Sequence, residues 1–476
     1  MFFRFFIGVV FLLSVFQSFG QKVTGFKTYK NFSLRGDSRV IGNNVVSIHS
    51  KDPYNDVGHF AKKNDRLPMV YIDIDNDPNT FSSSSATLAI PESASSIAYA
   101  GLYWAATYEH EEAEMKRGKT EYEYVPVKPR VDNYNNVLLK TPQQSYQSIS
   151  GTILEDYKDS IGRPYLCYAD VTKTLQSIPN ASGVYTVANV HATQGHILGG
   201  SSGGWMLYVI YNDDTTSNKK FVLQNGFQSV EKNEYELTIA AQDSASTNIT
   251  LGVLEGDERL KTDKVSLVYS EDEKPQMLFS PVRAEENFFN SSITLNDEVF
   301  LKRTPNSINT LGFDIASFNL PLDKSKISEE VKLNLTTVRD KFLLFFSALQ
   351  TNVIEASVPV VTPTKVEAEE VVVRVVEDKQ IENASAIKVR QTLKISSQKP
   401  GYYLITNVFS DKTLAEKWKT HLRSEGFSPE SFISPKNNWE YVYVNYSEQI
   451  QDLYVDYNRF KSDDTYSEIW ILEIKD

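Results

Sequence analysis

The chain has 476 residues, 41% hydrophobic and 23% charged, a length and composition that indicate a globular protein of two or three domains and exclude a disordered or membrane-embedded chain. Its 49 Lys and Arg against 61 Asp and Glu give a net charge of −12, which disfavours a nucleic-acid partner because phosphate binding needs a basic surface. The single cysteine, Cys167, excludes an intramolecular disulfide and Cys-rich zinc sites.

The first 20 residues are typical of a secretory signal. Arg4 precedes an apolar run from Phe5 to Phe16, and the small residues Ser18 and Gly20 follow. Because this run is short for a bilayer span, we predict a signal peptide over 1–20 that is removed on export; an uncleaved anchor helix is the alternative. No later segment reaches about 18 apolar residues, so we expect the exported chain not to span the membrane.

Residues 21–356 predict a succession of strands. Runs rich in Val, Ile, Tyr and Phe, separated by Gly, Asn, Asp, Ser and Pro, occur at 69–74, 86–90, 96–104, 183–190, 204–211, 220–224, 235–241, 248–254 and 340–349. Amphipathic helical periodicity is nearly absent between them. We therefore expect a mainly β fold with a large antiparallel β-sandwich region, not a βαβ fold. The pattern leaves open one large sandwich or two stacked ones divided near residue 220.

Residues 357–399 contain no aromatic residue and carry dense mixed charge, which predicts an exposed linker with one short strand at 371–376. The segment 400–476 predicts a compact α+β domain. Strands are expected at 402–409, 429–434, 439–446 and 467–474. Asp411 is placed to cap a helix, and a second helix follows the third strand. The order β-α-β-β-α-β is that of a ferredoxin-like domain.

The same segment resembles the sporulation-related repeat (SPOR) family. The runs that carry the resemblance are YYLITNVFSDKTLAEKWKTHLRSEGF (402–427), EYVYVNYS (440–447) and WILEI (470–474). The resemblance implies binding to peptidoglycan glycan strands. Where the family often has a glycan-facing Gln and Arg, this sequence has Ile405 and Tyr443, and Asn407 stands at the family's Gly position.

Fifteen of the last 76 residues are aromatic, and strand alternation predicts where their rings lie. If Leu404, Val442 and Val444 face the helices, the alternate positions of both strands face away from them. Rings beside Asn side chains suit saccharides, which offer C–H patches and hydroxyls. The predicted glycan-binding residues are Tyr403, Ile405, Asn407, Trp439, Tyr441, Tyr443 and Asn445. Cross-strand tyrosine pairs that only stabilise the sheet are the alternative, and a protein-docking surface is a third.

Several stretches of residues 25–356 resemble the β-sandwich modules of exported surface proteins of gliding Bacteroidetes. They include VYIDIDNDPNTFSSSSATLAIP (70–91), IAYAGLYWAATY (97–108), GGWMLYVIYND (203–213) and NTLGFDIASFNL (309–320). The resemblance implies an exported, non-catalytic scaffold or adhesion-like module, and it associates the chain with gliding or secretion machinery.

Three carboxylates form the strongest candidate metal site. Asp73, Asp75 and Asp77 are spaced i, i+2, i+4 and could wrap a hard cation in a loop, although Pro78 and Ser84 replace the Gly and Glu of an EF-hand. We interpret them as solvated turn carboxylates and predict no cofactor; structural calcium bound by Asp73, Asp75 and Asp77 is the alternative. The Gly-rich run at 199–205 lacks the spacing of a P-loop or a hydrolase elbow and predicts a turn.

These observations predict an exported, non-enzymatic protein of the periplasm or cell envelope. Its SPOR-like domain would bind peptidoglycan and tether a β-sandwich module that engages envelope or outer-membrane proteins. One alternative is a cell-surface adhesin of gliding or secretion machinery whose C-terminal domain docks on a protein. The other is a glycan-processing enzyme that the SPOR-like domain targets to its substrate.

Overall fold

The computed structural model describes residues 25–57, 63–118, 122–239, 247–256, 258, 260–270, 274–323, 326, 331–338, 341–353, 389–395, 398–424, 427, 429–435, 438–453, 456–457, 460 and 469–475. The chain divides into two units, Met1–Pro359 and Val360–Asp476, called here the N-terminal and C-terminal units. The predicted signal peptide at 1–20 and the short strand predicted at 371–376 lie outside the described residues.

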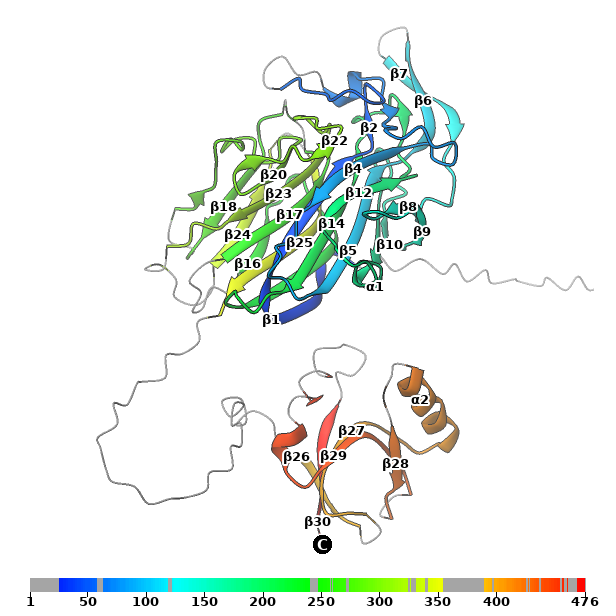
Figure 1. Ribbon diagram of the computed structural model, residues 1–476, viewed down its shortest axis with the longest axis vertical. Helices are drawn as coiled ribbons and strands as arrows, with labels where there is room; N and C mark the ends of the chain where they lie inside the picture. The colour runs from blue at the N-terminus through cyan, green and yellow to red at the C-terminus, as the bar shows by residue number, and fades with distance from the viewer. Residues whose placement is uncertain are drawn as a thin grey trace, which may run out of the picture. The chain divides into compact units, whose positions relative to one another are not determined.

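An eleven-stranded sheet is the centre of the N-terminal unit (Figure 1). Neighbouring strands are antiparallel except β20 and β23, which are parallel. In spatial order the strands are β10 (Thr152–Asp156), β11 (Pro164–Asp170), β5 (Ser96–Thr107), β14 (Gly203–Asn212), β1 (Lys27–Asn44), β15 (Asn218–Val230), β25 (Phe342–Asn352), β17 (Thr247–Leu254), β23 (Phe313–Asn319), β20 (Ile293–Leu295) and β21 (Glu298–Val299).

Smaller sheets complete this unit. A five-stranded sheet contains β22 (Arg303–Thr304), β4 (Ser83–Leu88), β12 (Gly183–Ala188), β8 (Asn136–Lys140) and β9 (Gln147–Ser150). A four-stranded sheet contains β16 (Tyr235–Ile239), β24 (Val331–Thr336), β18 (Lys264–Val268) and β19 (Gln276–Met277). Further elements among the described residues are β13 (Gln194–Gly195), β6 (His110–Arg117), β7 (Tyr122–Pro129), β2 (Val46–Ser47), β3 (Val70–Tyr71), η2 (Asn64–Arg66) and α1 (Thr172–Gln176).

Strand alternation divides the buried side chains of this unit into three cores. On β5, Trp104 belongs to a first core that β4, β8 and β12 also build, whereas Tyr103 belongs to a third core on the opposite face. On β25, Leu344 belongs to a second core shared with β16, β18 and β24, and Leu343 belongs to the third. The third core therefore lies between the two halves of the eleven-stranded sheet.

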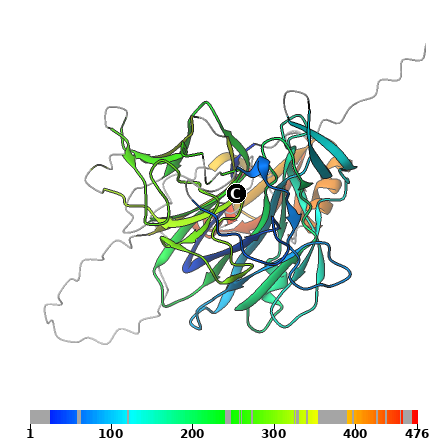
Figure 2. The same cartoon turned by 90° about the horizontal axis from the view of Figure 1, so that it is seen from above.

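The first and second of these three cores are sandwich cores, because each lies between the eleven-stranded sheet and a smaller sheet. The first draws on residues 41–211 together with Leu311, and the second on residues 230–344. Figure 2 shows the two parts side by side. Strand β1 joins them, because it pairs with β15 over Lys27–Arg35 and with β14 over Gly36–Asn44.

The described residues of the C-terminal unit form a five-stranded sheet, helix α2 (Lys412–Ser424) and the 3₁₀ turn η3 (Ile450–Leu453). In spatial order its strands are β26 (Val389–Lys394), β30 (Trp470–Lys475), β27 (Gly401–Phe409), β29 (Glu440–Ser447) and β28 (Glu430–Ile433). Asp411 caps α2 as predicted: its Oδ1 accepts a hydrogen bond from the Thr413 amide at 2.7 Å.

Strand β26 corrects one predicted boundary. It falls within 357–399, the range predicted as a linker, but it pairs in parallel with β30. Val389 packs against the core on the helix side of the sheet and Leu393 against the core on the other side, so burial of these apolar side chains outweighs the charge of the surrounding segment. Among the described residues, no helix is long and apolar enough to cross a membrane.

Candidate functional site

The two faces of the C-terminal sheet differ in what covers them. On one face Leu404 and Val442 pack with Ala415 and Leu422 of α2. On the other face Tyr403, Ile405 and Tyr441 form a separate cluster to which α2 contributes no residue among those described. We call the ring-bearing residues of this cluster the aromatic face; they are Tyr403, Phe432, Tyr441, Tyr443, Tyr446 and Trp470. The strand alternation read from the sequence places its Tyr members correctly on β27 and in the first half of β29.

The rings of the aromatic face pack on one another. Phe432 stacks on Tyr441 with centroids 5.4 Å apart and an interplanar angle of 10°. Tyr403 meets Tyr443 edge to face at 5.0 Å and Tyr446 at 4.8 Å. Offset-stacked and edge-to-face pairs of this kind contribute about 0.5–1.5 kcal/mol each beyond their buried area, so the rings also stabilise the sheet.

Burial separates the residues of this cluster into two groups. Tyr403 is 2% exposed, Ile405 0% and Tyr441 5%, so these three predicted residues support the face and do not present their side chains to a ligand. Tyr443, Tyr446 and Trp470 are partly buried and form the accessible part of the face.

The phenol groups of this face have partners within the protein. The Tyr403 hydroxyl donates to the Lys399 carbonyl at 2.7 Å, and the Tyr446 hydroxyl donates to the Pro400 carbonyl at 2.8 Å. The Tyr443 hydroxyl donates to Glu430 Oε2 at 2.5 Å. Burial raises the pKa of Tyr403 to about 12, and burial together with the Glu430 carboxylate raises the pKa of Tyr443. The phenols of Tyr403 and Tyr443 are therefore neutral at physiological pH.

Two predicted residues, Asn407 and Asn445, are not on the aromatic face. The pairing of β27 with β29 shifts between Leu404 and Ile405 and again between Ile405 and Asn407. As a result Asn445 pairs with Leu404 and its amide donates to Asp456 Oδ2 at 2.5 Å, while Asn407 pairs with Val442, a residue of the helix side. The prediction was wrong because each β-bulge moves the following side chains to the other face.

Trp439 is the most accessible of the predicted residues that carry a ring. It precedes β29, is 46% exposed, and its carbonyl accepts a hydrogen bond from the Ser434 amide at 2.9 Å. The sequence reasoning missed Phe432, Tyr446 and Trp470. Phe432 and Trp470 were visible as aromatic positions in predicted strands, whereas Tyr446 reaches the face only because of the shift in pairing.

The acidic run 73–77 forms a compact hydrogen-bonded loop. Ser83 Oγ donates to Asp73 Oδ1 at 2.9 Å and to Asp75 Oδ1 at 3.1 Å. Asp77 Oδ1 accepts from the Asn79 amide at 2.9 Å. Burial raises the pKa of Asp75, but hydrogen bonds from Tyr146, the Asp77 amide and Ser83 outweigh it and leave that pKa lowered. These hydrogen bonds fix the three carboxylates within the turn.

Among the described residues, no group of three or more His, Cys, Asp and Glu is arranged to hold a metal ion. Structural calcium at Asp73, Asp75 and Asp77 stays the alternative. Cys167 is fully buried in the first sandwich core, and burial raises its thiol pKa well above the ordinary value, as expected for a small core residue.

No family model and no curated protein matches this chain. Among solved structures, the major capsid protein P2 from Bacteriophage PM2 matches at 9% identity over 67% of this chain and 99% of that chain, with a TM-score of 0.17. The STIV MCP matches at 8% identity over 56% of this chain and 91% of that chain, with a TM-score of 0.19. TM-scores this low establish neither fold nor function.

Proposed function

We propose that the protein is an exported, non-enzymatic component of the cell envelope, whose C-terminal unit binds peptidoglycan glycan strands and tethers the N-terminal β-sandwich unit. The observation that carries this proposal is the aromatic face, which is formed on the side of the sheet away from α2. Its partly accessible rings, Tyr443, Tyr446 and Trp470, offer apolar planes beside carboxylate and carbonyl acceptors, a combination that suits a saccharide.

The order of elements in this unit supports the resemblance to SPOR domains. Along the chain β27, α2, β28, β29, η3 and β30 follow one another, and in space four strands lie in the order β30-β27-β29-β28. A ferredoxin-like domain has this order, with β26 as an added edge strand. We propose this fold for the unit, with the glycan strand lying across the accessible rings.

Tethering is the mechanism we propose. When one unit holds the wall, the other is confined near it, and its effective concentration toward a partner on the same surface rises without any new contact. The partners we propose for the N-terminal unit are envelope or outer-membrane proteins, and the proposed location is the periplasm or cell envelope.

Co-sedimentation with purified sacculi tests this function. The chain from residue 21 to 476 should pellet with sacculi, and more strongly with sacculi from which an amidase has removed the stem peptides. Trp439→Ala and Trp470→Ala should each weaken binding by about tenfold, which corresponds to about 1.4 kcal/mol. Phe279→Ala is the matched control, because Phe279 is a 70% exposed ring in the N-terminal unit.

Three outcomes would contradict tethering. A folded chain that does not pellet with sacculi would favour the surface adhesin whose C-terminal unit docks on a protein. Equal loss of binding in Phe279→Ala would show non-specific adsorption. Release of soluble muropeptides during the incubation would favour the glycan-processing enzyme.

A further inference from the structure

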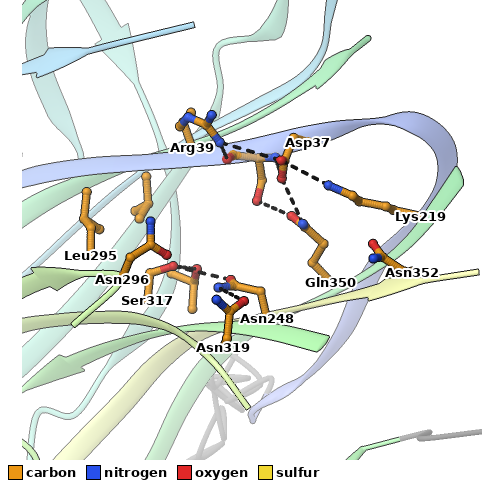
Figure 3. Close-up of a pocket in the computed structure, with 13 residues that line it drawn as sticks. Asp37, Arg39, Lys219, Asn248, Leu295, Asn296, Ser317, Asn319, Gln350 and Asn352 are labelled. Carbon is orange, nitrogen blue, oxygen red and sulfur yellow. Dashed lines mark hydrogen bonds and ion pairs between the residues drawn. The ribbon is translucent and has the colours of Figure 1, made fainter. Parts of the chain in front are cut away.

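A polar cleft opens in the N-terminal unit where β1 leaves β15 and joins β14. The last pair that β1 makes with β15 is Arg35–Asn218, and the first with β14 is Gly36–Asn212. Beyond this point β1 forms one wall of the cleft, while β17, β23 and β25 contribute to the opposite side (Figure 3). The cleft has a volume of about 510 Å³, within the range of about 300–1,000 Å³ that small-molecule sites occupy.

The sequence builds this cleft by changing from apolar to polar residues along one face of each strand. On β23 the third-core residue Ile315 is followed on the same face by Ser317 and Asn319. On β25 Ala348 is followed in the same way by Gln350 and Asn352. The space between the two halves of the sheet therefore passes from a sealed apolar core to an open polar cleft.

Carboxamides dominate the lining of the cleft. They are Asn248, Asn296, Asn319, Asn352 and Gln350. Hydroxyl groups come from Ser38, Thr250 and Ser317, and of the described residues that line the cleft, Val40 and Leu295 are apolar. An amide side chain both donates and accepts hydrogen bonds, so the lining matches a ligand whose groups also do both.

The charged groups of the cleft are engaged with one another. Asp37 Oδ2 lies 3.0 Å from Lys219 Nζ and 3.9 Å from Arg39 Nη1. Gln350 is held on both sides of its amide: its Nε2 donates to Asp37 Oδ1 at 2.8 Å and its Oε1 accepts from Ser38 Oγ at 2.7 Å. An anionic ligand would have to compete with Asp37 for both cations.

The amides on the other wall are held less firmly. Asn248 Nδ2 lies 3.4 Å from Asn319 Oδ1, and Ser317 Oγ lies 3.4 Å from Asn248 Oδ1, the long end of hydrogen-bond distance. The side-chain amides of Asn296 and Asn352 make no hydrogen bond to any residue that the structure describes, so these amides are available to a ligand.

We propose that this cleft binds a neutral, polyhydroxylated ligand, namely a short stretch of saccharide. Sugar hydroxyls donate and accept, as the carboxamides do, whereas an apolar ligand would leave those amides unsatisfied and an anion would meet Asp37. The site is separate from the aromatic face of the C-terminal unit and would give the N-terminal unit a ligand of its own.

Calorimetric titration of the chain from residue 21 to 476 tests the site. The probes are cellotetraose, maltotetraose, mannotetraose and chitotetraose, with tetragalacturonate as the anionic probe. At least one neutral tetrasaccharide should bind with a Kd below about 1 mM. Asn319→Ala and Asn352→Ala should each weaken that binding about tenfold. Because both residues are accessible and at most weakly bonded, both variants should keep the wild-type Tm.

Matched variants separate this site from the proposed wall contact. Asn133→Ala, which removes an exposed amide outside the cleft, should leave the affinity unchanged. The proposal is overturned if no neutral tetrasaccharide binds, or if tetragalacturonate binds in preference. It is also overturned if binding survives both cleft substitutions and is lost in Trp439→Ala, since the ligand would then belong to the C-terminal unit.

Discussion

Arg283 and Asp314 form an ion pair inside the N-terminal unit, with Nη2 and Oδ1 2.7 Å apart and side chains 3% and 0% exposed. The guanidinium also donates to Thr294 Oγ1 at 2.7 Å and to the carbonyl of Ile315 at 3.0 Å. Asp314 Oδ2 accepts from the Ser292 amide at 3.1 Å. These bonds connect β20 and β23 at one end of the eleven-stranded sheet.

Removing one member of this pair should destabilise the protein strongly. Arg283→Met leaves the Asp314 carboxylate buried without its cation, a change that costs about 3–5 kcal/mol. The free energy of unfolding, measured in urea, checks this value. In the double variant Arg283→Met, Asp314→Asn the loss should be smaller than the sum of the two single losses; additive losses would show that the two side chains do not interact.

Acid sensitivity should arise in part from Glu111. Its Oε2 accepts from the Tyr108 hydroxyl at 2.5 Å and lies 3.3 Å from His191 Nδ1. Burial raises the pKa of Glu111, but the hydrogen bonds from His191 and Tyr108 outweigh it and leave the pKa below its ordinary value of 4.5. The unfolded state then binds the proton more tightly, so this stabilisation is present above pH 4.5 and is lost as the pH falls through the lowered pKa.

Thermal unfolding between pH 6 and pH 3 tests this role. The Tm of the wild-type chain should fall with decreasing pH below about 4.5. The Tm of Glu111→Gln should fall less steeply, because residue 111 then has no carboxylate to protonate. A control, Glu114→Gln, changes a carboxylate with a 54% exposed side chain on the same strand. If Tm falls equally steeply with pH in all three proteins, the role of Glu111 is contradicted.

Among the described elements of the C-terminal unit, strand β26 is the one that extends the length of chain needed for folding. It covers one side of β30, and Ile395, one residue beyond it, is 4% exposed in the cluster of the aromatic face. A fragment starting at residue 400, the boundary expected from the sequence, would lose this strand and leave β30 as a bare edge.

Two fragments should therefore differ in stability. Residues 386–476 should unfold cooperatively, and residues 400–476 should have a lower Tm and expose more apolar surface. Differential scanning calorimetry and binding of a hydrophobic dye measure the two effects. Identical Tm values would show that β26 contributes nothing to the stability of the unit. The boundary at residue 400 would then be correct.

Sequence periodicity predicted four strands of the C-terminal sheet, β27, β28, β29 and β30, but it did not place every side chain on the correct face. Leu404, Val442 and the tyrosines up to Tyr443 lie on the expected faces. Asn407 and Asn445 do not, because the bulges between β27 and β29 arise from the pairing of two strands. The sequence of one strand does not determine its register with the strand it pairs with.

At the scale of the whole molecule, the two units have separate cores and should unfold separately. The two clusters of buried residues described in the C-terminal unit are each made of residues of that unit. We expect two calorimetric transitions. Leu404→Ala should destabilise the C-terminal unit by about 2–5 kcal/mol and shift only one of them, and Leu207→Ala, a change in the first sandwich core, should shift only the other. A single transition that both variants move would contradict independent units.

The mainly β character of the chain and the side of the C-terminal sheet on which most of its rings lie could be predicted from the sequence alone. These features follow from local alternation and composition, which each segment carries in its own residues. Three features could be read from the three-dimensional structure alone: Tyr403 and Tyr441 are buried by neighbouring rings, β26 joins the sheet, and amides from β17, β23 and β25 face β1 across one cleft. Such features depend on which distant segments meet, and pairing across hundreds of residues is set by the packing of the whole fold.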